Sequence, residues 1–180
     1  GDADWAVNGA GMSINHRYGF GAIDAAAAVV AAGSWTLLPA EKTPGTKASG
    51  VLTVAIPDGT GALGVYGAAA TNTINIATSA ITMVEFVDVT FASDHSYWLD
   101  LEITLTSPSG TKSVLTEAHY TTKAGVNIKP TGTELVGGVT FSSVRHTEEG
   151  PVGDWTIAVR DGGRGAGSYS KLSLPTNSPL

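Results

Sequence analysis

Asp100-Leu101-Glu102-Ile103-Thr104-Leu105-Thr106 is the stretch that decides the fold of this chain. Its leucines and isoleucine alternate with acidic residues and threonines, so a strand formed here has one apolar face and one polar face. The next four residues, Ser107-Pro108-Ser109-Gly110, have the composition of a tight turn. The stretch therefore predicts a half-buried strand that turns into a further strand at Thr111.

Similar runs recur on both sides of this stretch. Trp155, Ile157 and Val159 occupy alternate positions, as do Val87, Val89 and Phe91, while residues 123–136 have no pattern and indicate a long surface loop. The expected strands are residues 51–56, 73–77, 84–91, 99–106, 112–116, 139–143, 155–160 and 168–174. We expect a mostly β fold, a jelly-roll β-sandwich of about eight antiparallel strands preceded by a short Ala-rich helix.

The Ala-rich helix is predicted from Ala25 to Ala31. Asp24 can cap its first turn, and Gly33 is a natural end point. A helix of this length is marginal in water, and its small side chains suit close packing against another surface. We therefore expect its natural partner to lie outside this sequence.

Two sets of residues resemble known signatures. Trp5, Ala6, Asn8 and Gly9, followed by Tyr18-Gly19-Phe20-Gly21 and Asp24, resemble the end of the catalytic domain in kexin- and furin-like subtilisin-family proteases. Asp100-Leu101 through Ser107-Pro108 to Gly110-Thr111, and Gly153-Asp154-Trp155 through Asp161, resemble the P domain, or homo B domain, which follows it in that family. The chain is thus identified as a P domain with the C-terminal tail of a bacterial protease's catalytic domain.

The resemblance implies both a division of the chain and a function. Residues 1–33 would be the tail of the catalytic domain, residues 34–49 a linker and residues 50–180 the P domain. It would be a non-catalytic domain that stabilises the catalytic domain of the same protein and supports its folding. The parent protein would be a calcium-dependent serine endopeptidase, secreted or extracellular, with the periplasm or the cell surface as alternatives.

Composition narrows the classes of partner. The net charge of −6 argues against nucleic acid, and the scattered lysines and arginines argue against an anionic membrane surface. There are no cysteines, which excludes disulfides and thiolate metal sites. No apolar run has the length of a membrane span.

No catalytic residues are expected in this chain. A subtilisin-type nucleophile follows Gly-Thr, but each Gly-Thr here is followed by glycine, lysine or glutamate rather than serine, and no Gly-x-Ser-x-Gly motif occurs. The histidines are more simply structural or solvated than catalytic, because a triad requires mutual geometry. They are His16, His95, His119 and His146.

Calcium is the cofactor that the fold could carry. Asp100 precedes one predicted strand and Asp161 ends another, so antiparallel pairing brings both to one rim, where Asp94 could join them. The simpler alternative is that these carboxylates cap turns with neighbouring backbone amides.

Tyr97 and Trp98 support an alternative function. Adjacent aromatics in a loop can form a binding platform, although more often one of them lies in the core. The alternative is a jelly-roll module that binds carbohydrate or a protein substrate and so targets the enzyme. We also expect residues 1–33 either to fold back on the sandwich or to mediate self-association.

Overall fold

The computed structural model describes most of the chain. The described residues are 2–37, 40, 42, 45–49, 52–59, 65–95, 97–119, 121–123, 126–128, 135–163, 169–172 and 175–177. They form antiparallel strands, one α-helix and one short 3-10 helix at Trp98–Asp100. Within this part of the chain, no helix has the length and apolar character needed to cross a bilayer.

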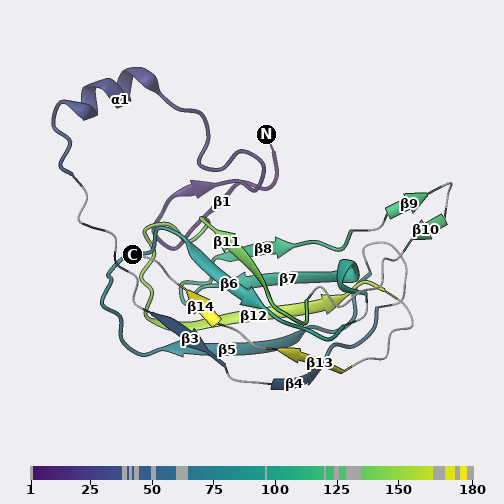
Figure 1. Cartoon of the computed structure of the whole chain (residues 1–180). Helices are drawn as coiled ribbons and strands as arrows, with labels where there is room; N and C mark the ends of the chain where they lie inside the picture. The colour runs from purple at the N-terminus through teal and green to yellow at the C-terminus, as the bar shows by residue number, and fades with distance from the viewer. Residues whose placement is uncertain are drawn as a thin grey trace.

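Two four-stranded antiparallel sheets form the sandwich, and Figure 1 shows them as two layers. One sheet has the order β5 (Ala70–Ile76), β12 (Gly153–Asp161), β7 (Leu101–Thr106) and β8 (Lys112–Thr116). The other has the order β11 (Val139–Ser143), β6 (Val87–Phe91), β14 (Pro175–Asn177) and β3 (Thr46–Ala48). Three strand pairs complete the fold: β4 (Leu52–Ala55) with β13 (Tyr169–Leu172), β9 (Thr121–Lys123) with β10 (Val126–Ile128), and β1 (Ala6–Val7) with β2 (Ser13–Ile14).

The alternating strands build the core between the sheets. Every second residue of β7 is buried, as are Val87, Val89 and Phe91 of β6 and Trp155, Ile157 and Val159 of β12. In the β7–β12 register, Leu105 lies opposite Ile157 and Ile103 lies opposite Val159. The period-2 prediction is therefore confirmed, and so is the mostly β sandwich fold.

Two segments differ from their predictions. β3 lies within residues 34–49, which the sequence assigned to a linker, because Thr46–Ala48 pairs with β14 at the edge of a sheet. β10 lies within residues 123–136, which were predicted as a long loop, and pairs with β9, which ends where that region begins. Neither segment shows a clear apolar alternation, so backbone pairing rather than side-chain patterning defines them.

The N-terminal part of the chain has two distinct pieces. The N-terminal hairpin, residues 2–19, contains β1 and β2 and lies beside the sandwich (Figure 1). Helix α1 (Ala25–Ala32) begins after Asp24, whose carboxylate accepts a hydrogen bond from the Ala27 N–H, so the predicted helix and its cap are confirmed. No residue of α1 is buried, and Figure 1 shows the helix standing away from both sheets.

Candidate functional site

The N-terminal hairpin is fastened to the sandwich by a polar cluster. Asn8 and Gly9, in the turn between β1 and β2, lie against Thr111, which follows the β7–β8 turn, and Glu149, in the turn after β11. We call these four residues the clasp. Because β7 runs from Leu101 to Thr106, the clasp lies just past the C-terminal end of that strand.

Asn8 uses its whole side-chain amide in this contact. Its Nδ2 donates to the carbonyl oxygens of Thr147, at 2.9 Å, and Arg145, at 3.2 Å. Its Oδ1 accepts from the N–H groups of Ala10 and Met12, at 3.0 and 2.9 Å. These four hydrogen bonds fix the turn and join it to the sandwich. Asn8 is only 4% exposed, so they satisfy a buried amide.

Glu149 is the acceptor at the centre of the clasp. Its Oε1 accepts from the Gly9 N–H at 2.7 Å and from the Thr111 hydroxyl, while the same Gly9 N–H lies 3.0 Å from Thr111 Oγ1. The carboxylate is almost fully buried. Burial raises the pKa of Glu149, but hydrogen bonds from Ser107, Thr111, Gly9 and Ser109 outweigh it and hold that pKa below its usual value.

A buried histidine lies behind this carboxylate. His146 Nδ1 is 3.6 Å from Glu149 Oε2, and its ring packs edge-on against Trp155 with 5.1 Å between ring centroids. Burial lowers the pKa of His146 to about 4, because the attraction of Glu149 does not make up for the lost hydration. His146 is therefore neutral at pH 7.

Gly9 fits a space that admits no side chain. A Cβ placed on it would lie 2.2 Å from Ser109 Oγ and 2.3 Å from Ser109 Cβ. These distances are far below van der Waals contact, so the turn approaches the β7–β8 turn as closely as a glycine permits. The close approach brings the Gly9 N–H to Glu149.

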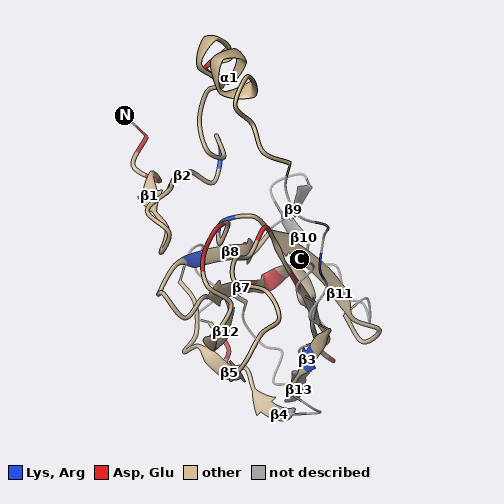
Figure 2. Ribbon diagram, turned by 90° about the vertical axis from the view of Figure 1, so that its left-hand side faces the viewer, with Lys and Arg blue, Asp and Glu red and all other residues tan. Residues whose placement is uncertain are grey.

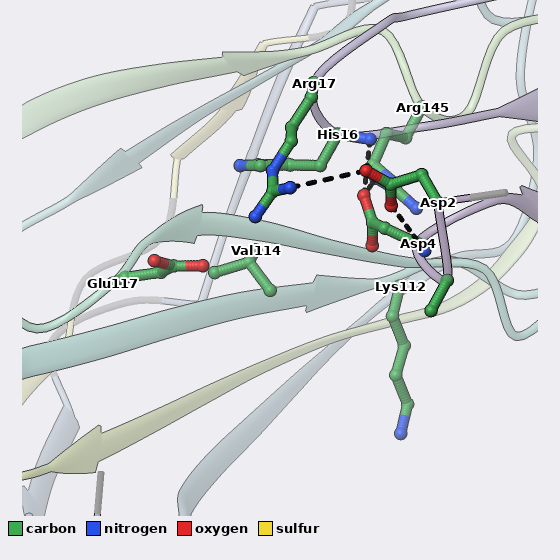
Figure 3. A pocket seen from close by; sticks show the side chains of 9 residues that line it. Asp2, Asp4, His16, Arg17, Lys112, Val114, Glu117 and Arg145 are labelled. Atoms are coloured by element: carbon green, nitrogen blue, oxygen red, sulfur yellow. Dashed lines mark hydrogen bonds and ion pairs between the residues drawn. The ribbon is translucent and has the colours of Figure 1, made fainter.

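A cavity of about 620 Å³ opens on another side of the hairpin, between it and β8. Figure 3 shows charged side chains of both signs around it, including Arg17 with Asp2 and Arg145 near Asp4. The nearest charged atoms are 3.3 Å apart in the first pair and 3.9 Å apart in the second. No serine, threonine or cysteine is among the described residues that line the cavity, so they include no nucleophile of the serine-protease kind.

The histidines lie in different settings. His16 and His119 are exposed, whereas His95 and His146 are fully buried. The Nε2 atom of His95 lies 3.3 Å from Asp161 Oδ2, and His146 faces Glu149. Each of the two buried histidines thus packs beside a buried carboxylate.

The predicted calcium residues are partly brought together. The β7–β12 register puts Asp161 opposite Leu101, and the Gly162 N–H donates to the Asp100 carbonyl oxygen at 2.9 Å, so Asp100 and Asp161 share one rim. Both are buried, whereas Asp94 is exposed. Asp161 Oδ1 also accepts from the Gly163 N–H at 2.6 Å, which is the turn-capping contact of the simpler alternative.

The described side chains at this rim do not by themselves complete a calcium site. In the part of the chain that the structure covers, no group of three or more histidine, aspartate or glutamate side chains is arranged to hold a metal ion. Calcium prefers six to eight oxygen ligands, several of which can be backbone carbonyls. The rim supplies two carboxylates, so calcium binding there stays a prediction.

Tyr97 and Trp98 are both half-buried. Trp98 packs against the hydrophobic core, and Tyr97 precedes the 3-10 helix that leads into β7. This matches the expectation that one aromatic of such a pair serves the core. Their role as a binding platform stays a prediction.

Sequence reasoning missed the clasp as a site. Its residues come from three separate parts of the chain, and Glu149 lies in neither of the two signatures and in no predicted strand. Asn8, Gly9 and Thr111 did lie inside the two quoted signatures, which was the available signal. A contact between the two signatures could have been sought, because both carry polar residues next to glycine.

Comparison with known proteins identifies the family. The proprotein convertase P-domain model matches residues 84–174, which is just over half of the chain and includes β6, β7, β8, β11 and β12. The chain belongs to the proprotein convertase P-domain family. The recognition based on its two signatures is confirmed.

Relatives of this P-domain chain are proprotein convertases. A PC3-like endoprotease, variant B, of Hydra vulgaris is 34% identical over 168 residues, covering 89% of this chain and 21% of the relative. Proprotein convertase subtilisin/kexin type 6 of Rattus norvegicus is 31% identical over 167 residues, covering 88% of this chain and 16% of the relative. The chain thus spans about a fifth of the length of these relatives.

Solved structures share the fold. The crystal structure of the Aeromonas sobria serine protease in complex with the chaperone ORF2 superposes with a TM-score of 0.73 at 24% identity. The alignment covers 97% of this chain and 33% of that one. At this identity the likeness concerns the fold alone.

Proposed function

We propose that this P-domain chain is a non-catalytic unit that docks on the catalytic domain of a subtilisin-family serine endopeptidase and stabilises it. The catalytic domain would belong to the same protein, secreted from a bacterium. Membership of the P-domain family and protease relatives support the proposal. The structural observation that carries it is helix α1, which is folded and capped but buries none of its residues.

The exposed side chains around α1 have the composition of an interface. Val29 and Val30 are 76% and 78% exposed, and Ile23, just before the helix, is 89% exposed. The helix sequence AAAAVVAA has no charged residue, and Figure 2 draws α1 in tan apart from the red of the acidic cap at its start. A marginally stable helix with apolar side chains gains its stability from a partner surface, and small side chains permit a close approach.

The clasp gives this interface a firm base. It fixes the hairpin that precedes α1, so a catalytic domain joined to the hairpin would be held against the sandwich by the partly buried hydrogen bonds of the clasp. Burial of about 600 Å² of apolar surface at ~25 cal/mol per Å² contributes on the order of 15 kcal/mol before ordering costs. Even a fraction of this is comparable with the stability of a whole domain.

Deletion within the whole protease tests the proposed function. We expect an enzyme truncated after residue 33 to yield less soluble, active protease and to lose activity faster on heating. A truncated enzyme that is as active and as heat-stable as the whole protease would contradict the stabilising role.

Peptide hydrolysis by the chain alone tests its non-catalytic character. We expect the purified 180-residue chain to give no turnover of peptide substrates, because it carries no recognisable nucleophile motif. Turnover that a serine-directed inhibitor blocks would contradict the proposal.

A further inference from the structure

Asn8 is distinct among the asparagines of the chain. The sequence contains six, and Asn8 alone is followed by glycine. In an Asn-Gly pair the backbone nitrogen of the glycine can attack the side-chain carbonyl carbon of the asparagine, since glycine has no Cβ to hinder the approach. Asn8–Gly9 is therefore the most reactive asparagine position that this sequence offers.

The closed clasp holds both reacting groups away from this reaction. The Gly9 N–H is engaged by Glu149 and Thr111, at 2.7 and 3.0 Å. The Asn8 amide is fixed by two carbonyl oxygens of the sandwich and by two N–H groups of its own turn. With Asn8 only 4% exposed, the attacking geometry and the water needed later are reached only when the turn leaves the sandwich.

We propose that the clasp protects Asn8–Gly9 from deamidation, and that deamidation in an opened clasp prevents the N-terminal hairpin from docking again. We call this irreversible opening the latch. In the reaction a bond forms between the Gly9 nitrogen and the Asn8 side-chain carbon. The side-chain nitrogen leaves as ammonia, taking up the proton of the Gly9 N–H. Water then opens the cyclic imide. The product is aspartate, or isoaspartate, in which the peptide bond to Gly9 is made by the side-chain carbon and the main-chain carboxylate is free.

The product no longer fits the clasp. An ionised carboxylate has no hydrogen to donate, so it would face the carbonyl oxygens of Arg145 and Thr147 without a bond. It would also add a second buried negative charge beside Glu149. Burial of an unpaired charge is costly, and the isomer in addition lengthens the backbone of a turn that accepts only glycine at position 9.

Ageing of the full chain tests the protection. We expect Asn8 of the folded 180-residue chain to deamidate at least ~10-fold more slowly than in the same chain kept in urea, measured by peptide mass spectrometry, because local opening limits the reaction. Glu149→Gln and Thr111→Val should raise the rate in the folded chain several-fold. Glu148→Gln, which removes an exposed carboxylate from the same turn, serves as the matched control and should leave the rate unchanged.

A product mimic tests the failure to dock again. Asn8→Asp should increase amide hydrogen exchange at residues 8–12 and speed proteolysis within the hairpin, whereas Thr78→Asp, which adds a negative charge at an exposed position of the loop after β5, should change neither. Equal deamidation rates in the folded and urea-treated chains, or an Asn8→Asp hairpin that stays protected, would overturn the latch. Both experiments use the isolated chain, so their outcome is independent of the proposed docking on a protease.

Discussion

The N-terminal hairpin and helix α1 lie next to each other in the sequence but relate to the sandwich in opposite ways. The hairpin buries Asn8, Ile14 and Asn15 and shares partly buried hydrogen bonds with two turns of the sandwich. Helix α1 buries nothing. A helix needs only a cap and favourable local residues to form, whereas docking needs a complementary surface, and among the described residues the hairpin has one and α1 does not.

The single substitution with the largest expected effect removes the docking of the hairpin. Gly9→Ala should destabilise the docked hairpin by about 2–3 kcal/mol, because its Cβ would clash with Ser109 and the clasp would lose hydrogen bonds. Urea unfolding and amide exchange at residues 8–12 measure the loss.

Ser109→Gly provides the control for this substitution. It removes both atoms that the new Cβ would meet at 2.2 and 2.3 Å, so the double variant Gly9→Ala/Ser109→Gly should recover most of the lost stability. Strictly additive effects of the two substitutions would contradict the close approach.

Acid should weaken the sandwich next to the clasp. The folded pKa of His146 is about 4, below its ordinary value of 6.5, so the unfolded chain binds the additional proton first. The free energy of unfolding should therefore fall as the pH drops from 6.5 to 4, by at most about 3 kcal/mol from this group. The lowered pKa of Glu149 adds a further loss below its ordinary value of 4.5.

Urea unfolding at a series of pH values measures this dependence. His146→Gln should flatten the curve between pH 6.5 and 4, whereas the exposed His119 replaced by glutamine should leave it unchanged. An unaltered slope in His146→Gln would assign the acid sensitivity to other groups.

Calcium should act on the sandwich while leaving the clasp unaltered. Asp100 lies at the start of β7, at the opposite end of the strand from the clasp, and shares its rim with Asp161. At about a hundredfold excess over its dissociation constant, calcium should add ~2.7 kcal/mol and raise the melting temperature relative to the chelated chain. Amide exchange at residues 8–12 should not respond.

Variants define which carboxylates take part. Asp161→Asn should abolish the calcium-dependent shift, and Asp94→Asn reports whether that exposed carboxylate contributes. Identical melting curves with calcium and with chelator would contradict calcium binding at this rim.

The smallest expected effect concerns the helix. Replacing Val29 and Val30 together by serine should change the stability of the isolated chain by less than about 0.5 kcal/mol, since both side chains are mostly exposed. In the whole protease the same pair should accelerate thermal inactivation. A large loss in the isolated chain would show that α1 already packs on the sandwich.

The same contrast explains what the sequence could predict. The alternation along Leu101–Thr106 specifies a half-buried strand because the two faces of a strand are two residues apart, and Asp24 and Gly33 mark a helix through local bonds. The clasp has no such local signal, because Asn8, Thr111 and Glu149 meet only after the strands have paired. β3 and β14 are edge partners defined by backbone hydrogen bonds, which leave little trace in side-chain pattern.

Amide hydrogen exchange of the isolated chain and of the whole protease tests the central claim most directly. We predict that the amides of residues 8–12 are protected in both, and that those of α1 exchange rapidly in the isolated chain but slowly in the whole protease. Rapid exchange of α1 in the whole protease would contradict the claim that this helix docks on a catalytic domain.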